Sequence, residues 1–122
     1  MKATNILYWA TTGLIGLMMT YSAYAYLTAP AMQQAFHHLG FPDYFRVELA
    51  VAKLLGVVLL LAPMAPRLKE WAYAGFAFVF VSAVIAHTAS GDPVGVRAAP
   101  SVFLVLLVVS YVTYHRRTAQ LA

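Results

Sequence analysis

The chain has 122 residues, of which 62% are hydrophobic and only 10% are charged, and its net charge is +4. A soluble domain is nearer half apolar and a quarter charged, so this composition excludes a water-soluble enzyme. The basic residues are scattered at the ends of apolar segments rather than along one face, which indicates membrane topology and excludes nucleic acid as a partner. Without cysteine, the chain forms no disulfide, thiolate metal site or dithiol relay of its own.

Four segments are apolar enough to span a bilayer, which takes roughly 20 helical residues. They cover approximately residues 5–27, 44–62, 71–88 and 98–114. Lys2 before the first apolar run also fits a signal peptide. However, the run continues from Ile6 to Leu27, longer than a typical signal-peptide core, and we interpret it as a retained span.

The connections between these segments differ in length and character. The first, "TAPAMQQAFHHLGFPDYF", has Met32, Phe36 and Leu39 at helical spacing, which predicts a short helix on the membrane surface that ends at Gly40 and Pro42. The second, "APMAPRLKE", and the third, "SGDPVGVRAAP", are short and rich in proline and glycine. Short connections join antiparallel neighbours, so we expect an all-α, up-down four-helix bundle in a single domain, residues 1–122.

The basic residues in the connections predict the orientation, because cytoplasmic loops are enriched in Lys and Arg. One side of the predicted bundle holds Lys2, Arg67, Lys69, Arg116 and Arg117, and the other holds Arg46 and Arg97. We therefore expect a multi-pass membrane protein with both termini in the cytoplasm.

Lys53 is the least expected residue of these segments. It lies about nine residues inside the second span, roughly 14 Å below the outer boundary and near the midplane of a ~30 Å core. A bare ammonium group there costs an estimated ~3 kcal/mol or more. Glu48, five residues away, points about 140° around the same helix, so we expect the partners of both residues on neighbouring helices.

These depths predict a polar cluster that opens to the outer side. Its members are Tyr21, Ser22, Arg46, Glu48, Lys53 and His87, with Asp92 and Arg97 above them. The inner end carries no comparable cluster in this interpretation, since its charges serve as anchors and topology signals. An ionisable residue inside a membrane is a functional hypothesis by default, and Lys53 is the strongest candidate.

Structural roles compete with functional ones for the other members of the cluster. Arg46 also fits an interfacial residue whose stem lies along the helix, and Glu48 also fits a boundary residue satisfied by His87. Whether Glu48 pairs with His87 or with Lys53 stays open. The histidines lack the i, i+4 spacing that would favour a metal or haem site, and we predict no catalytic residue.

Several motifs in a fixed order resemble the DoxX-like family of small bacterial membrane proteins. They are "FHHLGFPDYF", "VAKLLGVVLLLAP", "PRLKEWAYAGFAF" and "AHTASGDP". The resemblance runs from about residue 30 to 95, and it places Lys53 at the family's "AKLLG" lysine, Leu39–Pro42 at its "LGFP" turn and His87 in its "H.ASGDP" segment. It implies a four-span fold and a link to membrane oxidoreductase complexes, because the family name derives from subunits of a thiosulfate:quinone oxidoreductase.

Three functions are compatible with these observations. The first is an accessory subunit of a membrane redox or stress-response system, with a quinone- or lipid-like ligand in the polar pocket. Such a chain carries no cofactor of its own, needs a partner oxidoreductase and is no enzyme by itself. The second is an assembly or scaffold protein, and the third is a small-solute transporter. Contact with membrane lipid is expected in every case, and a homodimer is compatible with the small residues on the helices.

Overall fold

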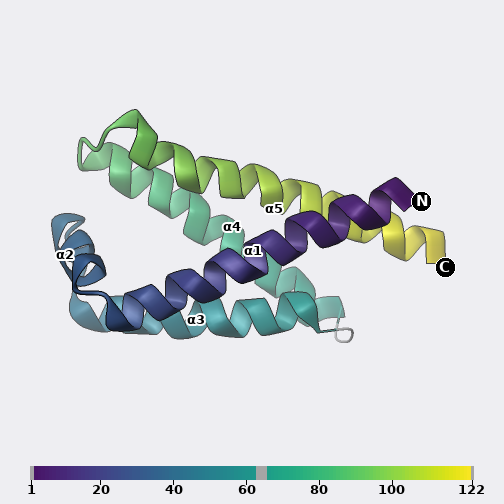
Figure 1. Ribbon diagram of the computed structural model, residues 1–122, viewed down its shortest axis with the longest axis horizontal. Helices are drawn as coiled ribbons and strands as arrows, with labels where there is room; N and C mark the ends of the chain where they lie inside the picture. The colour runs from purple at the N-terminus through teal and green to yellow at the C-terminus, as the bar shows by residue number, and fades with distance from the viewer. Residues whose placement is uncertain (1, 63–65, 122) are drawn as a thin grey trace.

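Apolar runs separated by proline and glycine fold into five helices over the residues that the computed structural model describes, 2–62 and 66–121 (Figure 1). Their bounds are Lys2–Thr28 (α1), Pro30–His38 (α2), Asp43–Leu61 (α3), Pro66–Ala89 (α4) and Val94–Leu121 (α5). The fold is therefore all-α, as predicted. Each of the four predicted spans corresponds to one long helix, although the span predicted over residues 44–62 runs one residue past the end of α3. At most other ends the helices extend past the spans, because the apolar run, not the helix, sets the predicted bounds.

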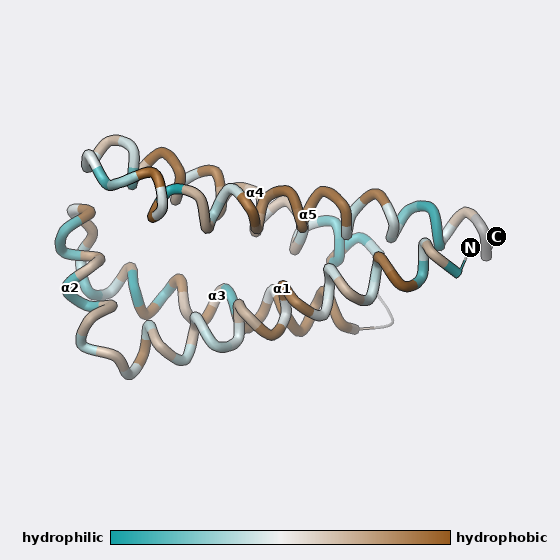
Figure 2. Tube along the Cα trace, turned by 45° about the horizontal axis from the view of Figure 1, so that its top comes forward, coloured by the Kyte–Doolittle hydropathy of each residue, from teal (hydrophilic) through white to brown (hydrophobic). Residues whose placement is uncertain are grey.

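Two of the described helices, α4 and α5, are long and apolar enough to cross a membrane. Figure 2 shows hydrophobic residues along most of both helices, whereas polar residues gather at α2 and near the termini. α3 is not apolar enough to meet this criterion, because its 19 residues include Asp43, Arg46, Glu48 and Lys53. Threonine, tyrosine and serine residues lower the mean hydropathy of α1. Four spans and their orientation stay a prediction.

The four long helices run alternately in opposite directions, so both termini lie at the end of the bundle opposite α2 (Figure 1). α1 packs extensively against α3 and α5, and α4 packs against α5, whereas the α3–α4 seam is less extensive. Figures 1 and 2 both show the α4–α5 pair splayed from the α1–α3 pair toward the α2 end. This splay positions the candidate site.

The predicted short helix between the first two long helices is confirmed as α2. Pro30 occupies its first turn, where its missing N–H leaves no hydrogen bond unmade. At its end the N–H of Gly40 donates to the carbonyl of His37, and the N–H of Phe41 donates to that of Phe36. Gly40 has a φ of 87°, a left-handed conformation that suits glycine at a helix C-terminus.

A buried hydroxyl network joins three helices in the half of the bundle nearer the termini. Thr12 Oγ1 of α1 lies 2.6 Å from Ser110 Oγ of α5, and Tyr73 OH of α4 lies 2.7 Å from the same atom. Lys69 is also buried, and its Nζ donates to the carbonyl of Leu60 at 3.1 Å. The expectation that this end carries no comparable polar cluster is therefore wrong: threonine, serine and tyrosine supply a cluster that a survey of charges overlooks.

Candidate functional site

A cavity of about 460 Å³ lies between the splayed helix pairs, directly beneath α2. We call it the α2 compartment. α2 and the residues after it contribute Met32, Ala35, Phe36, Leu39 and Phe41; α1 contributes Tyr26; α3 contributes Phe45 and Leu49; α4 contributes Phe78, Val79, Ser82, Ala83, Ala86 and His87; α5 contributes Val96. Its walls are almost entirely apolar, and its volume falls in the range of about 300–1,000 Å³ usual for ligand pockets.

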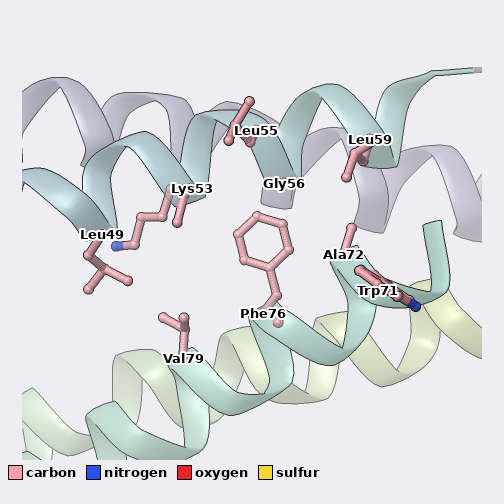
Figure 3. A pocket seen from close by; sticks show the side chains of 11 residues that line it. Leu49, Lys53, Leu55, Gly56, Leu59, Trp71, Ala72, Phe76 and Val79 are labelled. Carbon is pink, nitrogen blue, oxygen red and sulfur yellow. The ribbon is translucent and has the colours of Figure 1, made fainter. Parts of the chain in front are cut away.

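A second cavity of about 280 Å³ continues along the α3–α4 seam toward Trp71, and we call it the Trp71 compartment. In Figure 3 the ring of Phe76 lies against Gly56, and the side chains of Leu49 and Val79 face each other near Lys53. Leu49 and Val79 line both cavities. The two compartments therefore adjoin along the α3–α4 seam, and together we call them the cleft.

Lys53 lies where the two compartments meet. Its side chain is 5% exposed and lines the Trp71 compartment. Its Nζ donates to Ser22 Oγ at 2.9 Å and lies 3.9 Å from the ring centroid of Tyr26, and Tyr26 in turn lines the α2 compartment. One hydroxyl and one aromatic face thus offset part of the cost of the buried ammonium group.

Two arginines lie near the same end of the bundle. Arg46 donates from its guanidinium group to the carbonyl of Tyr26, near the C-terminal end of α1. The Nε atoms of Arg46 and Arg97 are buried, and neither has a hydrogen-bond partner within residues 2–62 and 66–121. Both arginines therefore retain donor capacity that the described part of the chain does not use.

A carboxylate links α2 to the turn between α4 and α5. Asp92 Oδ1 lies 2.8 Å from His38 Nε2, and Asp92 Oδ2 lies 2.6 Å from His87 Nδ1. The hydrogen bonds from the two histidines hold the pKa of Asp92 below its ordinary value. Because His87 lines the α2 compartment and His38 ends α2, this contact bridges the two helix pairs at the α2 end of the cleft.

The structure divides the predicted polar cluster into two groups. Ser22 and Lys53 are in contact, as are His87 and Asp92, whereas no hydrogen bond joins one pair to the other in the described segments. Arg46 belongs with the first group through Tyr26, and Arg97 lies one turn into α5.

Two predicted members lie outside both groups. Tyr21 is 66% exposed. Glu48 is exposed, and within the described residues it makes no hydrogen bond or ion pair, so neither His87 nor Lys53 is its partner. The physical reason lies in α3: residues 50, 53, 57 and 60 form its buried face, and Glu48 lies far around the helix from that face.

Sequence reasoning missed Tyr26, His38 and the contribution of α2 to the cleft. Tyr26 is one helical turn beyond Ser22 on the same face, which is a signal that could have placed it beside Lys53. His38 is an exposed residue at the end of a surface helix, and nothing in its local sequence indicates a contact with a residue 54 positions away.

A sequence profile of the DoxX-like family matches residues 10–110. The chain belongs to the DoxX-like family. The matched region contains the whole cleft, both groups of polar residues and the greater part of each long helix. Among curated proteins and solved structures, a search finds no match to this DoxX-like chain.

Proposed function

We propose that this DoxX-like protein binds an elongated lipid- or quinone-like molecule in the cleft between α3 and α4. The observation that carries the proposal is that the two compartments adjoin end to end along the seam and share Leu49 and Val79 in their walls. A long apolar space with polar groups at defined points suits an amphipathic chain rather than a compact polar solute. The splay of the helix pairs supplies the space, and α2 covers one end of it (Figure 1).

The protein acts as an accessory subunit of a membrane redox or stress-response system in this proposal. Support comes from family membership and from the chemistry of the sequence, which contains no cysteine to carry electrons. A partner oxidoreductase would then perform the electron transfer, and this chain would hold or deliver a membrane-soluble molecule. The protein lies in the bacterial inner membrane, with four spans, cytoplasmic termini and α2 on the opposite surface.

A cleft-filling variant tests the binding proposal. Ala83 lines the α2 compartment, so Ala83→Phe places a ring in the space that a ligand would occupy. Ala99 is an exposed residue of α5 outside both compartments, so Ala99→Phe adds the same volume elsewhere. Native mass spectrometry of the gently extracted proteins, followed by ligand identification, compares the molecules that each variant retains.

We expect the natural sequence and Ala99→Phe to retain the same lipid- or quinone-like adduct and Ala83→Phe to lose it. Adducts that are equally abundant on all three proteins would place the bound molecules on the outer faces of the helices and refute the proposal. A redox-active adduct such as a quinone would support the accessory-subunit role directly.

A further inference from the structure

The acidic side chains of this protein leave the cations around the cleft without partners of opposite charge. The sequence has four acidic residues, and the structure describes all of them. Three of them pair with histidines: Asp43 with His37, Glu70 with His115, and Asp92 with both His38 and His87. The fourth, Glu48, is exposed and unpaired within the described residues. No carboxylate therefore neutralises a lysine or arginine among residues 2–62 and 66–121.

Lys53 is the most deeply buried cation among the described residues. An ammonium group has three N–H donors, and Ser22 accepts one hydrogen bond while the Tyr26 ring offers only its face. Both partners are neutral, and Lys53 is only 5% exposed, so water does not stabilise its charge in their place. A buried charge without a counter-ion is costly, and an anion in the adjoining cleft would offset that cost.

The other buried lysine provides an internal comparison. Lys69 Nζ donates to the Leu60 carbonyl, in the last turn of α3, where unpaired helix carbonyls carry partial negative charge. Lys69 thus has a carbonyl at a helix end as its partner, and it lines neither compartment of the cleft. Lys53 differs in both respects, since its partners are a hydroxyl group and a ring face rather than a carbonyl at a helix end, and it lies at the cleft.

We propose that the cleft takes an anionic amphiphile, whose acidic oxygen atoms lie beside Lys53 and whose alkyl chain occupies the α2 compartment. The inference rests on the proposed function, because it names the chemical class of the molecule in the same cleft. Leu49 and Tyr26 connect the position of Lys53 to that compartment, since both line it and Tyr26 contacts the ammonium group. The shared chemistry is an anionic oxygen on an apolar chain, whether a free alkyl carboxylate or an acidic phospholipid.

The test compares two probes of equal chain length that differ in charge. The purified protein in a neutral detergent is titrated with dodecanoate or with dodecan-1-ol, at a pH well above the pKa of the free acid, and binding is followed by native mass spectrometry. We expect the natural sequence to bind dodecanoate more tightly than the alcohol by roughly tenfold or more, the usual worth of a hydrogen bond to a charged group. Lys53→Met should lose this preference and keep the alcohol's affinity, whereas Lys69→Met should retain the preference.

The outcomes separate this inference from the proposed function. Equal binding of both probes by the natural sequence overturns the anionic assignment and leaves a neutral ligand in the cleft, whereas binding of neither probe counts against the cleft as a lipid site. Equal binding of the two probes by the natural sequence overturns the anionic assignment even if Lys53→Met does not fold, whereas a preference for dodecanoate is assigned to Lys53 only by the variant. In a second arm, phosphatidylglycerol competes against phosphatidylcholine: preferential retention of phosphatidylglycerol identifies an acidic phospholipid as the source, and retention of dodecanoate alone identifies a free carboxylate.

Discussion

Two lysines are buried in the described part of the bundle, and each satisfies its ammonium group differently. Lys69 uses a backbone carbonyl at the end of a helix, whereas Lys53 uses a serine hydroxyl and a tyrosine ring. Hydroxyl groups also join α1, α4 and α5 around Ser110, which is fully buried. Individual polar side chains therefore fix both the site and the contacts between helices.

Ser110→Ala should destabilise the protein, because Thr12 and Tyr73 lose their shared hydrogen-bond partner in a buried position. We expect a loss of about 1 kcal/mol in the free energy of unfolding, the order usual for hydrogen bonds between membrane helices. Thermal unfolding in detergent measures it. Ser101→Ala is the control, since Ser101 is exposed and donates only to the Arg97 carbonyl of its own helix. Equal stability of the two variants would contradict a stabilising role for the network.

Asp92 should make stability depend on pH in a defined acidic range. Hydrogen bonds from His87 and His38 keep its pKa in the folded protein below the ordinary value of 3.8. Its contribution to stability is therefore complete above that ordinary value and disappears as the pH falls through the depressed pKa. The unfolding temperature of the natural protein should fall more steeply below about pH 4 than that of Asp92→Asn. Parallel curves for the two proteins would show that the carboxylate contributes nothing.

The sequence predicts part of this residue-scale detail. The burial of Lys53 follows from its place within an apolar run, and Ser22 was among its expected neighbours. The exposure of Glu48 was not foreseen, because the direction in which a side chain points depends on which face of α3 packs against α1. Asp92 contacts His38 because α2 and the α4–α5 turn lie at the same end of the bundle, an arrangement of whole helices that no local sequence pattern predicts.

At the scale of elements, the α3–α4 seam depends on a glycine. A Cβ atom placed on Gly56 would lie 2.7 Å from ring atoms of Phe76, a residue that is buried in the core of the bundle. At Gly13, in contrast, such a Cβ atom would meet no side chain and no other helix within 4 Å, its two chain neighbours aside. Close packing at Gly56 therefore sets how near α3 and α4 approach beside the Trp71 compartment.

Gly56→Ala should push the Phe76 ring into the Trp71 compartment and destabilise the protein by about 1–3 kcal/mol, the usual cost of overpacking. Gly13→Ala should leave stability within about 0.5 kcal/mol, or raise it slightly through helix propensity. Thermal unfolding of both variants checks the difference. A stable Gly56→Ala protein with unchanged ligand retention would mean that the seam opens without cost.

The positions of the helices were largely predictable, and their arrangement was not. Apolar runs and breaks at proline or glycine predict the bounds of each helix to within a few residues. α2 is included, because its apolar residues have helical spacing and Gly40 follows its end. The arrangement depends on pairings of side chains such as Gly56 with Phe76 at the seam and His38 with Asp92 between α2 and the α4–α5 turn. Such pairings join residues far apart in the chain.

At the scale of the whole molecule, the even number of long helices places both termini at the same end of the bundle (Figure 1). Single-cysteine variants can test this topology cleanly because the natural chain has no cysteine. Ala31 on α2 and Ala119 near the end of α5 are both exposed. In intact spheroplasts, a membrane-impermeant maleimide should label Ala31→Cys at once and Ala119→Cys only after permeabilisation. The reverse pattern, or equal labelling, would contradict the proposed orientation.

The measurement that tests the central claim most directly is photo-crosslinking with a fatty acid that carries a diazirine in its alkyl chain. After irradiation in membranes, peptide mapping by mass spectrometry locates the adducts. A cleft that binds an anionic amphiphile predicts adducts concentrated on α3 and α4 residues such as Leu49 and Val79, and reduced in Lys53→Met. Adducts spread evenly over exposed faces, on residues such as Leu17 and Val105, would show an ordinary lipid-facing surface and contradict the account.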